Sequence, residues 1–141
     1  MNSYCARRTR RLAIAALLAV LCLSGVALAG TYLNRALVLV KHSGEEAEFL
    51  RSHLYDLELA RITQRVAEAR LRAARETQVP KEVEQAHPHL LLLLEHYERA
   101  ASAALESKPG KFAELVNQAH DEEQIFRSIL RQFGWPLPDE H

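Results

Sequence analysis

The stretch 80-PKEVEQAHPHLLLLLEHYERAASAALE-106 decides the fold, because it contains five consecutive leucines, Leu90 to Leu94. Five successive residues of an α-helix point around its whole circumference, so neighbours must cover this helix on more than one side. The wider apolar pattern advances by three and four residues, as in a helix-packing seam: Val83, Ala86, Leu90, Leu93, Tyr97, Ala100 and Ala104. The stretch is therefore predicted to be the central helix of a bundle.

The composition favours helices along the rest of the chain. The 141 residues include only 5 glycines and 5 prolines, and alanine, leucine, glutamate and arginine are abundant. These four are good helix formers. No convincing alternating strand pattern and no internal repeat is present, and the length after the N-terminal segment suits one small domain. The predicted class is all-α.

The N-terminus has the features of a membrane-targeting segment. Arginines at positions 7, 8, 10 and 11 precede 22 residues without a charge, Leu12 to Leu33. As an anchor, this stretch spans a bilayer core of about 30 Å. As a signal peptide, it is cleaved after Ala29, before Gly30. Both alternatives stay open: a single-pass membrane protein with its C-terminal domain extracytoplasmic, or a secreted, periplasmic domain.

Charge and cysteine distribution argue against several functions. Without the four leading arginines, the chain has 14 basic and 18 acidic side chains, whereas nucleic-acid-binding domains are normally basic. Both cysteines, Cys5 and Cys22, lie in the N-terminal segment, so the remainder forms no disulfide and no thiolate site. No nucleophile elbow and no glycine-rich phosphate loop is present. We expect no enzymatic activity, no cofactor and no nucleic-acid partner.

Four segments are predicted along the chain. They are the anchor or signal peptide (1–34), a juxtamembrane helical stalk (35–44), an extracytoplasmic helical bundle (45–135) and a loose tail (136–141). Ser43 and Glu46 match a capping box, which predicts that a long first helix begins there and runs to about Thr77. The last helix is predicted from about Lys111 to Phe133, with a left-handed glycine cap after it.

Short connections between these helices make neighbours antiparallel. The predicted architecture is therefore an antiparallel three-helix bundle (up-down-up), preceded by the membrane or leader helix and the stalk.

Inside the first helix the apolar phase changes. The first half is apolar at Ala47, Leu50, Leu54 and Leu57, and the second half at Ile62, Val66, Ala69 and Ala73. The two faces differ by about 100°, so the helix either bends near Arg61 or faces two different neighbours.

A polar layer is predicted halfway along the bundle. The last helix carries Glu122 and Glu123 where its seam should be apolar. At the same height lie Arg61 of the first helix and Tyr97 of the middle one, so Arg61 is predicted to pair with one of the glutamates. Such a layer either fixes the register of the helices or forms a ligand or proton site.

Histidines offer an alternative site. Matching heights along antiparallel helices brings His96, His120 and Glu122 together. Two imidazoles and a carboxylate are a donor set that suits Zn²⁺ and other transition metals. However, both histidines lie at the flank of their helices, where side chains are usually only solvated.

Leu91 and Leu92 lie outside the Leu90/Leu93 seam, on a side that a three-helix bundle exposes. Either the stalk or the phase-shifted half of the first helix covers them, or a partner protein or second copy does. We expect a non-enzymatic accessory or interaction subunit of a membrane or envelope complex, with Leu91, Leu92 and the stalk as its contact surface. The alternative is an extracytoplasmic metal- or small-ligand-binding bundle, a sensor or chaperone.

Overall fold

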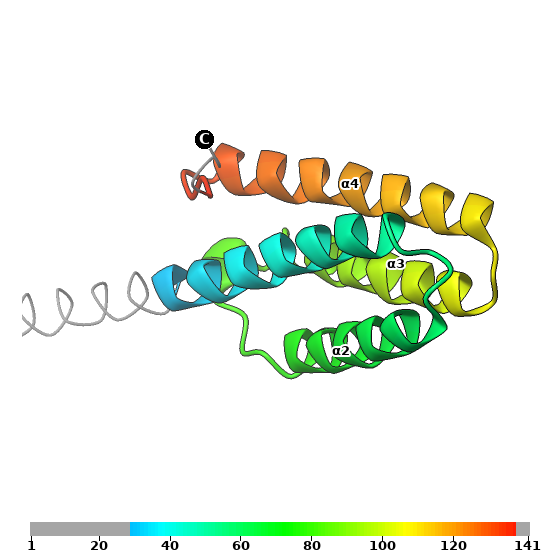
Figure 1. The fold of residues 1–141 in the computed structure, drawn as a ribbon. Coiled ribbons are helices and arrows are strands. Elements are labelled where there is room, and N and C mark those ends of the chain that lie inside the picture. The colour runs from blue at the N-terminus through cyan, green and yellow to red at the C-terminus, as the bar shows by residue number, and fades with distance from the viewer. Residues whose placement is uncertain (1–28, 138–141) are drawn as a thin grey trace, which may run out of the picture.

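The leucine-rich stretch forms α3 (His87–Leu105), which lies at the centre of the helical arrangement in Figure 1. The computed structural model describes residues 29–137. Over that range it contains an N-terminal helix (residues 29–51), α2 (Leu57–Arg75), a short 3-10 turn η1 (Lys81–Val83), α3 and α4 (Pro109–Gln132), and no strand. Successive helices alternate in direction, and α2 and α4 lie on opposite sides of the N-terminal helix and α3. The all-α class is confirmed for these residues.

The central position of α3 is visible in its burial. Its buried residues surround much of its circumference: Leu90, Leu93, Leu94, Tyr97, Ala100, Ala101, Ala103 and Ala104. Pro88 lies in the first turn of α3, where backbone N–H groups have no partner within the helix. The N–H that proline lacks therefore costs no helical hydrogen bond, and the helix begins there without a kink. Leu91 is partly buried against the core, and Leu92 is 40 % exposed.

The predicted start of the first helix at Ser43 is wrong. The N-terminal helix continues through Ser43, which is 4 % exposed and lies inside the bundle. On either side of it, the same helical face is buried at Tyr32, Ala36, Val40, Ala47 and Leu50. Ser43 therefore matches the sequence pattern of a helix cap although it lies on the buried face of a continuous helix. The predicted stalk residues belong to the bundle, and four helices contribute to the core instead of the predicted three.

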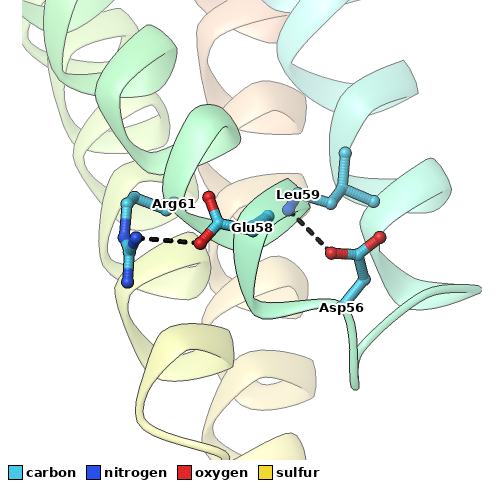
Figure 2. Close-up of polar contacts among 4 residues, drawn as sticks. All are labelled: Asp56, Glu58, Leu59 and Arg61. Carbon is cyan, nitrogen blue, oxygen red and sulfur yellow. Dashed lines mark hydrogen bonds and ion pairs between the residues drawn. The ribbon is translucent and has the colours of Figure 1, made fainter.

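The helix predicted to run from Ser43 to Thr77 is divided into two. Residues 52–56 form a turn, and α2 begins after Asp56. The Asp56 carboxylate accepts a hydrogen bond of 2.9 Å from the Leu59 N–H, as Figure 2 shows. An aspartate at this position satisfies a backbone donor that the first helical turn leaves free. The change of apolar phase therefore marks a turn between two helices, and this turn ends at Asp56, five residues before Arg61.

The turn also alters which face of α2 is buried. The buried residues are Ala60, Ala67, Leu71 and Ala74. The predicted seam of Ile62, Val66, Ala69 and Ala73 is wrong, since Ile62 is 60 % exposed and both alanines are exposed. Alanines at positions 60, 67 and 74 stand one above another on α2, and their small side chains allow its backbone to approach its neighbours closely.

The three- and four-residue spacing of apolar residues in α4 predicts one buried face, and most of that face is buried: Phe112, Leu115, Val116, Ala119, Phe126 and Leu130. Ile129, on the same predicted face, is only partly buried, and Phe133 is 46 % exposed. The end of α4 is a Schellman motif, with Gly134 at φ 78°. The Gly134 N–H donates to the Arg131 carbonyl at 3.1 Å, and the Trp135 N–H donates to the Leu130 carbonyl at 2.9 Å. Leu137, expected in the loose tail, is buried in the core.

Within residues 29–137, none of the helices combines the length and apolar character needed to cross a bilayer. Residues 1–28 of the predicted anchor or signal peptide (1–34) lie outside the described part of the chain, whereas residues 29–34 belong to the N-terminal helix and Tyr32 packs in the core.

Candidate functional site

The predicted pairing of Arg61 with a glutamate of α4 is wrong. The Arg61 guanidinium donates to Glu58, one turn earlier on α2, at 2.9 Å, and both side chains are exposed (Figure 2). The reason is the turn at residues 52–56, which rotates α2 so that its alanine face meets the core. Arg61 consequently lies in solvent, and α2 contributes no charge to the polar layer at that position.

The two glutamates find other partners. Glu122 lies 2.7 Å from Nδ1 of His89, on the first turn of α3. Glu123 accepts a 2.7 Å hydrogen bond from Nε of Arg127, one turn further along α4. The Glu123 and Arg127 side chains are each only about one-fifth exposed and therefore interact in a partly dehydrated environment.

Tyr97 is the buried member of the polar layer. It is 4 % exposed, and no residue of the described range makes a hydrogen bond to its hydroxyl. Its ring packs edge-on against His120, with ring centroids 6.3 Å apart. Burial raises the pKa of the Tyr97 hydroxyl, and the negative charges of Glu123 and Glu48 raise it further, while Arg51 opposes them. Carboxylates on two different helices therefore act on this hydroxyl.

These side chains line a polar pocket of about 160 Å³, named here the Tyr97 pocket. Its lining residues come from three helices: Val40, Lys41, Gly44, Glu45 and Glu48 from the N-terminal helix, Tyr97 from α3, and His120, Glu123 and Arg127 from α4. Gly44 lies close to Tyr97, since a Cβ added there would be in ordinary van der Waals contact with the Tyr97 hydroxyl at 3.5 Å. The prediction of a polar layer placed Tyr97 beside Glu123, but it missed the residues of the N-terminal helix.

The alternative metal ligands are not assembled into a metal-binding group. Across residues 29–137, no set of three or more His, Cys, Asp and Glu side chains is arranged to hold a metal ion. His120 contacts Tyr97, and Glu122 pairs with His89. Nδ1 of His96 is buried and has no hydrogen-bond partner within this range. The carboxylate predicted to join His96 and His120 is therefore bound to a different histidine, His89.

A second feature is an apolar surface outside the core. The residues predicted to form the buried seam of α2 instead form an apolar stripe along its surface, called the α2 stripe: Ile62, Val66, Ala69 and Ala73. The C-terminal end of the stripe borders a surface groove of about 570 Å³ between α2 and the N-terminal helix. Ala73 and Thr77 line the α2 side of this groove. The N-terminal helix contributes Thr31, Asn34, Arg35, Val38 and Leu39 to this groove. Val38 is exposed, so the groove has an apolar wall on both helices.

No protein-family model matches this chain, and neither a curated protein nor a solved structure matches it. The Tyr97 pocket and the α2 stripe are the features of residues 29–137 from which a function can be inferred.

Proposed function

We propose that the chain is a non-enzymatic helical interaction module, anchored in a membrane or exported across it by its N-terminal segment. In this proposal the module binds a helix of a partner protein through the α2 stripe. The observation that carries the proposal is the second apolar face of α2. Ile62 is 60 % exposed, although it begins a series of apolar residues at helical spacing.

A surface helix needs only one apolar face to pack on its own core. In α2 the core face is already supplied by Ala60, Ala67, Leu71 and Ala74. The α2 stripe is a separate series with steps of four, three and four residues, which is the spacing of helix-packing seams. Contiguous apolar residues that remain outside a core commonly mark interaction sites.

The neighbouring groove extends the apolar surface onto a second helix. Ala73 belongs both to the α2 stripe and to the groove, and Val38 and Leu39 form the opposite wall. A helix laid into such a groove buries one face through residues spaced by three and four positions. Val38 belongs to the predicted stalk, so this surface overlaps the contact surface expected from the sequence. Leu92, on α3, is a separate exposed residue.

Basic side chains accompany the apolar ones. Arg65 lies next to Val66 and is exposed, and within residues 29–137 no carboxylate pairs with it. Arg35 lines the groove. These charges favour a partner helix that carries carboxylates beside its apolar face. They disfavour antiparallel self-pairing of two α2 stripes, which would bring Arg65 of one copy near Arg72 of the other.

The proposal can be tested by photo-crosslinking in the native cell, with the full chain. A benzophenone amino acid at position 62 is expected to give a discrete crosslinked product. The same amino acid at position 117, an exposed polar site on α4, and at position 55, an exposed apolar site on the turn, serves as control. Products from position 55 or 117 but not from position 62 would contradict the proposal.

A further inference from the structure

The Tyr97 pocket is internally balanced. Its carboxylates, Glu45, Glu48 and Glu123, each pair with a basic side chain of their own helix, and the Tyr97 hydroxyl is buried. By contrast, apolar aromatic side chains stand outside the core at one end of the bundle.

This end, called here the proximal end, consists of residues 29–35, 76–88 and 131–137. Phe133 is 46 % exposed there, and Trp135 is only partly buried. We propose that the proximal end rests on the surface of a lipid bilayer, with Phe133 and Trp135 in its interfacial layer. This inference rests on the proposed function in its membrane-anchored form.

The length of α4 brings the two aromatic side chains to the proximal end. Figure 1 shows that α4 ends at the same end of the bundle at which the N-terminal helix begins. α4 has 24 residues, whereas its antiparallel neighbour α3 has 19. Because the tight connection at residues 106–108 keeps their other ends level, α4 reaches about 7 Å further than α3. Phe133 and Trp135 therefore lie beyond the first turn of α3.

The uncharged N-terminal stretch enters the bundle without a linker. Its last residues, 29–33, belong to the N-terminal helix, and Tyr32 is 3 % exposed in the core. As a helical anchor, the uncharged residues 12–28 would span about 25 Å, less than the roughly 30 Å of a bilayer core. An anchor of that length leaves no spacer between the bilayer and the bundle. The proximal end then meets the lipid headgroups.

The two side chains suit this position. Tryptophan combines an apolar ring system with a polar N–H, and it is enriched at membrane–water interfaces. The Schellman motif fixes the chain around them, with Gly134 at φ 78° and the Trp135 N–H bound to the Leu130 carbonyl. A rigid turn therefore presents Phe133 and Trp135, so their contact with lipid requires no ordering of the backbone.

Charge does not select a particular lipid. Arg131 is exposed two residues before Phe133, where it can reach a lipid phosphate. Asp139 and Glu140 follow in the sequence and oppose an attraction to anionic lipids. Apolar contact is therefore the main contribution, and a zwitterionic phospholipid suffices as the probe.

The test is tryptophan fluorescence of the full chain in phosphatidylcholine vesicles. Trp135 is the only tryptophan of the chain, so its emission reports on the proximal end alone. The vesicles contain either ordinary lipid or lipid brominated in its acyl chains, because bromine quenches only a tryptophan that lies close to it. Flotation of the vesicles first shows whether the chain is bound to them. The emission of Trp135 is expected to be about twofold lower, or more, in brominated vesicles.

One control moves the tryptophan to the opposite end of the bundle. It combines Trp135→Phe with Tyr55→Trp, since Tyr55 is 93 % exposed on the turn before α2. The emission of this variant should be equal in the two kinds of vesicle.

A matched pair of variants then tests the aromatic contact itself. Phe133→Glu should reduce the quenching of Trp135 about twofold or more, because a charged side chain avoids the interface with hydrocarbon. Ile125→Glu changes a side chain of similar exposure, 41 %, two turns earlier on α4, and should leave the quenching unchanged. Both variants should keep their helicity and still float with the vesicles.

Flotation separates the two claims. A full chain that does not float with the vesicles contradicts the anchored form of the proposed function and this inference with it. A chain that floats while Trp135 is not quenched overturns this inference alone. Equal quenching of the Tyr55→Trp control, or unchanged quenching in Phe133→Glu, overturns it as well.

Discussion

The guanidinium of Arg70 and the carboxylate of Glu46 form a two-pronged ion pair, with hydrogen bonds of 2.6 and 2.5 Å. The pair joins α2 to the N-terminal helix across the bundle. Only 16 % of the Arg70 side chain is exposed, so this contact is better shielded from water than the other ion pairs of α2. The pair fastens the N-terminal helix to α2, whose buried residues face the core shared by the four helices.

Replacing Arg70 with alanine is expected to lower the free energy of unfolding by about 1–3 kcal/mol, because it leaves Glu46 partly buried without its partner. Arg72→Ala is the matched control, since Arg72 pairs with Glu68 on the exposed face of the same helix. That change should cost no more than about 0.5 kcal/mol. Urea unfolding followed by circular dichroism measures both. Equal effects would show that the Arg70 pair is not a structural link.

The cap of α2 gives a second stability prediction. Asp56→Ala removes the acceptor for the Leu59 N–H (Figure 2), and loss of such a cap costs about 0.5–2 kcal/mol. Glu58→Ala, two residues away, removes only the exposed pair with Arg61 and should cost less than about 0.5 kcal/mol. Thermal unfolding of the two variants measures the difference. A larger effect for Glu58→Ala would contradict the assigned cap.

Stability should also decrease in mild acid because of His87. Its Nδ1 lies 3.0 Å from the hydroxyl of Tyr32, near the start of the described N-terminal helix. Burial raises the pKa of Tyr32, so its hydroxyl stays protonated and donates a hydrogen bond to Nδ1 of the neutral imidazole, in the tautomer that carries its hydrogen on Nε2. Burial lowers the pKa of His87 from its usual 6.5. Folding therefore disfavours the charged imidazolium.

The sign of the pH effect follows from that direction. A histidine whose pKa is lower in the folded state contributes stability above pH 6.5, and the contribution is lost as the pH falls through the folded-state pKa. The free energy of unfolding should therefore decrease as the pH falls below about 6.5. In His87→Gln this decrease should be smaller. An unchanged pH profile in that variant would assign the effect to other groups.

Leu91 and Leu92 are adjacent in sequence but differ in burial. Leu91 packs partly against the core, so Leu91→Glu should lower the free energy of unfolding by about 1–3 kcal/mol. Leu92 is exposed, and Leu92→Glu should change it by no more than about 0.5 kcal/mol. Chemical unfolding measures both variants. The part of Leu91 and Leu92 in partner binding stays a prediction, which crosslinking from position 92 tests.

Local patterns were sufficient for α3, α4 and the cap at Gly134. In each, the apolar spacing, the turn residues and the observed burial agree. The division of the first helix was harder to predict. Asp56 is a good cap residue, but the capping-box pattern at Ser43 and Glu46 suggested a different start. A serine buried between helices has the same sequence neighbourhood as a serine at a helix end.

The candidate site shows the same limit. Positions along α3 and α4, which are antiparallel neighbours with a short connection, predict Tyr97 and Glu123 at the same height. His120, predicted only as a metal ligand with His96 and Glu122, packs against Tyr97 instead. Arg61 was assigned wrongly because the rotation of α2 depends on the turn before it. Glu48 and Gly44 were missed since nothing in a local pattern tells which face of the N-terminal helix meets α4. Their place in the Tyr97 pocket depends on how the N-terminal helix packs against α3 and α4, which is a matter of tertiary structure.

The most direct test of the α2 stripe as an interaction surface is the size of the native complex. The full chain, extracted gently from its own cells, should sediment as a particle larger than its 16.0 kDa monomer. Tyr55→Glu, an exposed change away from the α2 stripe, should sediment like the unmodified chain. Ile62→Glu is expected to sediment as the monomer with its helicity intact. If Ile62→Glu instead stays in the same large complex, the α2 stripe is not the contact surface.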